Sequence, residues 1–147
     1  MKLLVPCLLG CFAIMLPAVA SPASDHPAVG KTVPAVTVRT DKSASVSLRA
    51  ALGSKPTVLI FYRGGWCPFC TRHLAALAEA EADLRAAGFQ LLAISPDRPE
   101  KLRARPSHQN LPYTLLSDSE MNAAKAFAID FKVEDSLVAR YKESHGI

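Results

Sequence analysis

Two cysteines, Cys67 and Cys70, lie three residues apart between an apolar run and a long helical pattern. The apolar run predicts a strand that ends just before the pair, and the helical pattern begins at Pro68. A helix N-terminus carries unpaired backbone N–H groups and a partial positive charge, which stabilise a nearby thiol as the thiolate. The thiolate attacks peroxides and disulfides, so this spacing and position predict redox chemistry.

The two other cysteines, Cys7 and Cys11, lie inside a segment that is typical of a secretory signal peptide. A lysine at position 2 precedes an apolar stretch, and small residues end the segment at Ala20. We therefore expect residues 1–20 to be removed and the protein to be secreted or periplasmic, where a disulfide can persist. Lipid attachment at Cys11 is the alternative, but the residues after Cys11 stay apolar where a tether would be polar, which favours ordinary cleavage.

Composition narrows the classes of partner. The 147 residues carry a formal net charge of +4, and the sequence has no lysine or arginine run interleaved with aromatic residues. We therefore expect no nucleic-acid partner, and no membrane partner once the signal has been cleaved. Residues 21–32 predict a flexible N-terminal segment. One domain is expected over residues 33–147, which is long enough to bury a hydrophobic core.

The apolar pattern predicts an α/β fold. Residues 57–62 form a nearly continuous β-branched and aromatic run, typical of a strand buried on both faces of a parallel sheet. A helix is predicted over residues 68–87 with Gly88 as its C-terminal cap, followed by a strand at residues 90–94. Together they form a strand–helix–strand unit whose crossover should be right-handed.

The flanking segments carry weaker signals. The remaining expected elements are an edge strand at residues 33–38, a helix from Glu100 interrupted by Pro106, a short strand at 113–116, a helix from Ser117 to about Ala128, and a partly helical segment at 131–147. Ser117 and Glu120 have capping-box spacing. Three further polar residues are expected to cap helices or turns, namely Asp97, Asp118 and Ser119. Phe127 and Phe131 are expected in the core.

The string Phe-Tyr-Arg-Gly-Gly-Trp-Cys-Pro-Phe-Cys at residues 61–70 resembles the active-site string of the peroxiredoxin-like branch of the alkyl hydroperoxide reductase and thiol-specific antioxidant (redoxin) family. The strings at residues 30–34, 94–97 and 115–118 are similar to other motifs of that family. The resemblance covers residues 30–147 and implies a thioredoxin-like fold. It also implies a thiol peroxidase that needs no metal, flavin or nucleotide cofactor and is restored by an external thiol reductant such as a thioredoxin-like protein.

The resemblance leaves the roles of the two cysteines open. Typical family members have Pro-x-x-x-Thr-x-x-Cys, and that register puts Arg63 on the proline, Cys67 on the threonine and Cys70 on the attacking cysteine. A thioredoxin register instead makes Cys67 the attacking thiol and Cys70 the resolving thiol. Arg63 either stabilises a thiolate or is exposed or salt-bridged, and Trp66 either shields the thiols or packs in the core or rim.

The sequence departs from the family at its C-terminus. Related domains continue with a strand that carries a cis-proline opposite the cysteines, a second hairpin strand and a closing helix. This sequence stops at Ile147 before any of them, and its last proline is Pro112. We therefore expect an incomplete domain with an unpaired sheet edge through which the protein could associate.

Several interpretations of the pair follow from these residues. A structural disulfide is disfavoured because the closed loop is too short to remove much unfolded-state entropy. A zinc site is disfavoured because the four histidines, His26, His73, His108 and His145, lack ligand spacing. Three functions remain: a peroxidase acting on hydroperoxides, a thioredoxin-like reductase acting on protein disulfides, and an inactive redoxin fragment that is either a binding module or a truncated translation product.

Overall fold

The computed structural model describes residues 30–145, so the expected signal peptide and most of the segment at residues 21–32 lie outside the described part. The strands are β1 (Thr37–Thr40), β2 (Ser45–Ser47), β3 (Thr57–Phe61), β4 (Gln90–Ser95) and β5 (Thr114–Ser117). The helices are α1 (Leu48–Leu52), α2 (Pro68–Ala86), α3 (Pro99–Ala104), α4 (Asn122–Ala126) and α5 (Asp135–His145), with a short 3-10 helix at Pro106–His108. None of these described helices is long and apolar enough to cross a membrane.

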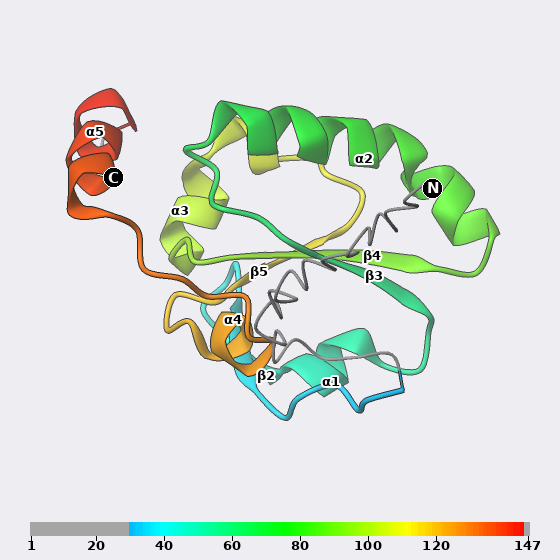
Figure 1. The fold of residues 1–147 in the computed structure, drawn as a ribbon. Coiled ribbons are helices and arrows are strands. Elements are labelled where there is room, and N and C mark those ends of the chain that lie inside the picture. The colour runs from blue at the N-terminus through cyan, green and yellow to red at the C-terminus, as the bar shows by residue number, and fades with distance from the viewer. Residues whose placement is uncertain (1–29, 146–147) are drawn as a thin grey trace, which may run out of the picture.

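The strands form one mixed sheet in the order β2-β1-β5-β4-β3. β4 pairs in parallel with β3 and β5, while β1 is antiparallel to β2 and β5. α2 lies on one face of the sheet, and α1 and α4 lie on the other (Figure 1). Alternate residues of β4 serve the two faces: Ala93 packs with Leu74 of α2, and Ile94 belongs to the core cluster that includes Leu48 of α1. The α/β fold expected around the strand–helix–strand unit is confirmed.

α2 begins and ends where the sequence predicts. Cys67 is its N-cap residue in extended backbone, and Pro68 lies in the first turn, where its missing N–H leaves no helical hydrogen bond unmade. At the other end, Gly88 has φ +87°, a conformation that favours glycine, and its N–H donates to the carbonyl of Arg85. Local sequence therefore determines the helix start that carries Cys67 and Cys70.

Two strands differ from the prediction in their surroundings. The edge strand expected at residues 33–38 is wrong: β1 begins at Thr37 and lies between β2 and β5, because the hairpin partner β2 covers its outer side. β3 is not buried on both faces. It pairs only with β4 among the described strands, and all five of its residues are partly exposed. Within the described sheet β3 is an edge strand, and association through its unpaired side stays a prediction.

The helix expected from Glu100 is shorter than the sequence suggests. α3 ends at Ala104, and Pro106 starts the separate 3-10 helix. Proline lacks the backbone N–H that would continue the α-helical ladder, and the residue before it is pushed toward extended backbone. Arg105 does have extended backbone, with ψ 122°.

The start expected for the next helix is wrong. The capping box between Ser117 and Glu120 does not form, because Ser117 is the last residue of β5 and α4 begins several residues later. Asp118 caps α4 instead, as its two carboxylate oxygens accept the N–H groups of Ala123 at 2.9 Å and Ala124 at 2.8 Å. Asp118 is 3% exposed, so this cap is buried.

The last part of the chain leaves the sheet. Phe127 packs against the core cluster, as expected. Phe131 is 78% exposed, which corrects its expected core position: it belongs to the connection that leads away from the sheet toward α5. None of the residues of α5 is fully buried, and Figure 1 shows this helix standing apart from the sheet.

The buried cap at Asp118 can be tested by stability. Asp118→Ala leaves two buried N–H groups without their charged acceptor, so we expect the free energy of unfolding to fall by about 2 kcal/mol. Urea denaturation followed by circular dichroism measures this loss. Ser119→Ala is the matched control, because Ser119 is the exposed neighbour and should leave the midpoint nearly unchanged. Equal effects of the two substitutions would contradict the cap.

Candidate active site

Both cysteines lie at the N-terminus of α2 and are free thiols. Cys67, the N-cap residue, is 3% exposed. Cys70 lies one turn later, is partly buried, and packs against the cluster of Tyr62, Leu74 and Ala93. The structure therefore brings the predicted pair together beside the carboxyl end of β3.

The two thiols differ in their electrostatics. Burial opposes ionisation of Cys67, but hydrogen bonds from the Cys70 thiol and from backbone N–H groups outweigh it, so the pKa of the Cys67 thiol is lowered. The positive charge of Arg63 adds a smaller contribution in the same direction. Burial raises the pKa of Cys70, and its interaction with Cys67 raises that pKa further. Cys67 is thus the better thiolate of the pair.

The loop of residues 63–66, which directly precedes the two cysteines and is called the active loop below, is hydrogen-bonded to the segment that follows β4. The Gly65 N–H donates to the Asp97 carboxylate at 2.7 Å, and the same carboxylate accepts the Ser95 hydroxyl at 3.2 Å. Gly65 also lies so close to its neighbours that a Cβ there would meet the His108 ring at 2.5 Å. From the sequence, Asp97 is expected to cap a helix or a turn. In the structure Asp97 accepts a hydrogen bond from Gly65, 32 residues away in the sequence, and no local sequence pattern predicts such a contact.

Arg63 and Trp66, the two supporting residues proposed from the sequence, contact each other. The Arg63 guanidinium lies over the Trp66 ring at 4.9 Å and over the Tyr141 ring at 4.8 Å from the centroids. Trp66 also contacts Tyr141 and His145 of α5, each with centroids 5.2 Å apart. Arg63 is therefore exposed but anchored on aromatic rings, and the described residues give it no salt bridge.

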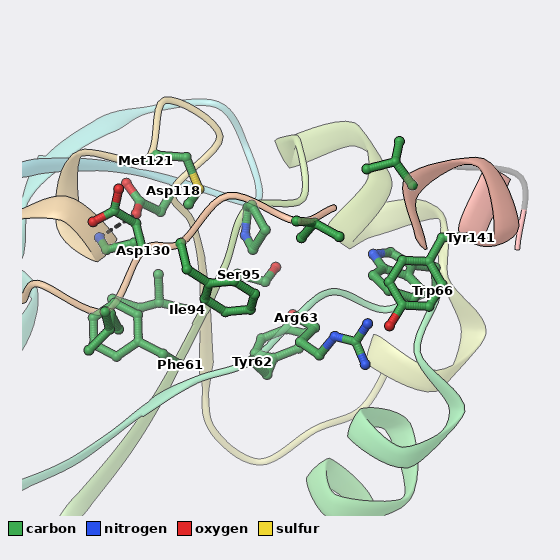
Figure 2. Close-up of a pocket in the computed structure, with 16 residues that line it drawn as sticks. Phe61, Tyr62, Arg63, Trp66, Ile94, Ser95, Asp118, Met121, Asp130 and Tyr141 are labelled. Atoms are coloured by element: carbon green, nitrogen blue, oxygen red, sulfur yellow. Dashed lines mark hydrogen bonds between the residues drawn. The ribbon is translucent and has the colours of Figure 1, made fainter. Parts of the chain in front are cut away.

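Tyr141 and His145 were missed as site residues, and no signal in the sequence points to them. Their contacts with Trp66 arise because the connection before α5 brings that helix back over the loop of residues 63–66. Figure 2 shows Tyr141 beside Trp66 at the same end of the site as Arg63.

A buried polar cluster lies behind the loop. His108 is 8% exposed, its ring meets the Tyr62 ring edge-on at 6.0 Å, and neither ring nitrogen has a hydrogen-bond partner among the described residues. Burial lowers the pKa of His108, so its ring is neutral near pH 7. Burial also raises the pKa of Tyr62, which keeps its hydroxyl protonated. His73, in contrast, is exposed on α2.

A cavity of about 470 Å³ adjoins the loop on its Arg63 and Trp66 side (Figure 2). Neither cysteine lines it. Its lining residues are Phe61, Tyr62, Arg63, Trp66, Ile94, Ser95, Pro96, Asp118, Met121, Ala124, Ile129, Asp130, Phe131, Val133, Val138 and Tyr141. Within the described chain, no group of three or more His, Cys, Asp or Glu side chains could hold a metal ion.

Comparison with known proteins gives a consistent set of relatives. The family model described as AhpC/TSA family matches residues 29–141. A putative peroxiredoxin bcp of Haemophilus influenzae is 34% identical over 101 residues, which are 69% of this chain and 64% of the relative. The chloroplastic peroxiredoxin Q of Gentiana triflora is 35% identical over 111 residues, which are 76% of this chain and 51% of the relative. The chain thus spans about half to two thirds of the length of these relatives.

Solved structures show the same fold. Reduced Prx3 of Vibrio vulnificus, in complex with H2O2, has a TM-score of 0.68 at 21% identity, covering 74% of this chain and 72% of its own. Peroxidoxin BcpB of Mycobacterium tuberculosis has a TM-score of 0.64 at 23% identity, covering 71% of this chain and 68% of its own. The thioredoxin-like peroxiredoxin fold expected from the sequence is confirmed.

The opposite pKa shifts of Cys67 and Cys70 predict that the two thiols are alkylated with different pH dependence. Because the pKa of Cys67 is lowered and that of Cys70 is raised, Cys67 keeps its thiolate to lower pH, and its alkylation rate should have its midpoint below that of a free cysteine. The pH midpoint of iodoacetamide labelling, which does not depend on how exposed each sulfur is, should be lower for Cys67 than for Cys70. Peptide mapping by mass spectrometry measures both rates.

Variants at Cys70 sharpen this prediction. Cys70→Ala removes the side-chain donor and should move the Cys67 midpoint to higher pH. Cys70→Ser is the matched control, because its hydroxyl can still donate to the Cys67 sulfur. A labelling midpoint for Cys70 at or below that of Cys67 in the unmodified chain would contradict the assignment.

Proposed function

The chain belongs to the AhpC/TSA family, and on that premise we propose that it is a thiol-dependent peroxidase that reduces hydroperoxides through Cys67 and Cys70. The observation that carries the proposal is the pair of free thiols at the start of α2, one with a lowered and one with a raised pKa. A thiolate next to a protonated thiol is the state that such a reaction needs at its first step.

The proposed reaction starts at the Cys67 thiolate. Its sulfur attacks the terminal oxygen of the hydroperoxide, the O–O bond breaks, and the hydroxyl stays on sulfur as a sulfenic acid. The departing alkoxide or hydroxide takes a proton and becomes an alcohol or water. The Cys70 sulfur then attacks the Cys67 sulfur, water leaves with the Cys70 proton, and a disulfide forms. An external dithiol, for which we propose a thioredoxin-like protein, supplies two electrons to restore the thiols.

The choice of Cys67 as the attacking residue is part of the proposal. The pKa directions favour Cys67, whereas the register of typical family members puts Cys70 at the attacking position. The products are the same in both cases, because the two roles exchange within one pair. We also propose that the reaction takes place in a secreted or periplasmic compartment, on the strength of the signal peptide expected at residues 1–20.

A second candidate function, reduction of protein disulfides, is favoured by one observation. The lowered pKa belongs to the first cysteine of the Cys-x-x-Cys string, the position that attacks a disulfide in the thioredoxin register. Cys67 would form a mixed disulfide with the substrate protein, and Cys70 would release it and leave the pair oxidised.

Kinetics on one preparation separate the two functions. We expect the reduced chain to consume hydrogen peroxide in stopped-flow experiments faster than it reduces insulin disulfides. Loss of peroxide consumption in both single variants, Cys67→Ser and Cys70→Ser, under turnover with a dithiol would support the two-cysteine cycle. Brisk insulin reduction with a negligible peroxide rate would reject the peroxidase in favour of the reductase.

Trapping identifies the attacking residue. After peroxide treatment, a sulfenic-acid reagent should label Cys67 in the Cys70→Ser variant, because the resolving thiol is gone. The Cys67→Ser variant should give little label. If the label instead forms on Cys70 in Cys67→Ser and not in Cys70→Ser, the typical peroxiredoxin register applies and the assignment of Cys67 is wrong.

A further inference from the structure

The cavity beside the active loop has the properties of a small-molecule site. Its volume of about 470 Å³ lies in the range of ligand pockets, about 300–1,000 Å³. Apolar side chains form most of its wall, including Phe61, Ile94, Met121 and Val138. They come from β3, β4, α5 and the segment just before α4, so the wall is assembled by tertiary contacts. Such a wall fits an aliphatic or aromatic body.

Arg63 supplies a cation at one end of this cavity. The centroids of Trp66 and Tyr141 lie 4.9 and 4.8 Å from its guanidinium carbon and only 5.2 Å from each other. Both rings therefore lie on the same side of the guanidinium, and the N–H donors that point away from the rings stay available. No hydrogen bond or salt bridge from this guanidinium occurs among residues 30–145. Arginine donors in this arrangement match a carboxylate, which can accept two parallel bonds.

The opposite end of the cavity is acidic but less able to bind a charged group. Figure 2 shows Asp118 and Asp130 well separated from Arg63. Asp118 already accepts two backbone N–H groups with its two oxygens, so its charge is stabilised by α4. Asp130 is exposed and solvated. Arg63 is exposed as well, but its guanidinium is held over the Trp66 and Tyr141 rings, so charge complementarity favours a ligand whose charged group meets this fixed cation.

We propose that this cavity binds an aliphatic monocarboxylate, with the carboxylate on Arg63 and the chain against the apolar wall. The cysteines do not line the cavity, so this is a binding site next to the thiols and distinct from the position where they react. The proposal rests on the geometry of the cavity and does not require the peroxidase activity proposed above.

Trp66 gives a direct signal for binding, because it is the single tryptophan of the chain and lines the cavity. We expect decanoate, added to the reduced chain below its micelle-forming concentration, to change the Trp66 emission in a saturable way. The uncharged analogue 1-decanol should bind about fivefold more weakly, the gain expected for a partly exposed ion pair. Decyltrimethylammonium should bind more weakly still. No peroxide is present, so failure of this test is distinguishable from failure of the peroxidase.

Charge variants test the role of Arg63. Arg63→Gln should remove the preference for decanoate over 1-decanol while leaving binding of 1-decanol in place. Arg140→Gln is the matched control: it removes the same charge from the residue next to Tyr141, but Arg140 does not line the cavity, so the preference should remain. Calorimetric titration of the same variants checks affinities independently of the tryptophan signal.

Several outcomes would overturn the proposal. They are the absence of saturable decanoate binding by both fluorescence and calorimetry, equal affinity for decanoate and 1-decanol in the unmodified chain, tighter binding of decyltrimethylammonium, or an unchanged preference in Arg63→Gln. Loss of the preference in Arg140→Gln as well as in Arg63→Gln would show general electrostatic attraction and would also reject the site.

Discussion

The hydrogen bond from the Gly65 N–H to the Asp97 carboxylate, 2.7 Å long, ties the active loop to the end of β4. The loop has little freedom elsewhere, because a Cβ at Gly65 would collide with the His108 ring and one at Gly64 with the Trp66 ring. Cys67 must follow this loop directly and becomes the N-cap of α2. The position of the thiols, the stack of Arg63 on Trp66 and the neighbouring cavity all depend on this constraint.

The pKa of Cys67 is lowered and that of Cys70 is raised because of their different positions in the first turn of α2. Cys67 receives donors from the first turn of α2, and these donors outweigh the cost of its burial. Cys70 is itself one of those donors and packs against the apolar cluster around Leu74, so its proton is retained. One pair therefore contains a thiol with a lowered pKa and a thiol with a raised pKa.

The sequence predicted those elements whose boundaries are set locally. Pro68 and Gly88 mark the ends of α2, and the apolar runs at residues 57–62 and 90–94 mark β3 and β4 within one residue. Errors occurred where boundaries depend on partners far away in the chain. Ser117 has the spacing of a capping residue but is the last residue of β5. The partial exposure of β3 follows from its position at the edge of the described sheet. A run of apolar residues predicts that a strand forms, but it does not predict whether the strand lies at the centre or at the edge of the sheet.

By itself, the sequence determined the family, the fold class and the cysteine pair at a helix start, because each depends on residues within a short stretch. The tertiary structure alone decided which thiol is the better thiolate and that Asp97 accepts from Gly65. It alone also brought Tyr141 of α5 onto Arg63 and formed an open apolar cavity between them and the sheet. These contacts join side chains distant in sequence, and their strength depends on burial and direction, which spacing along a chain does not encode.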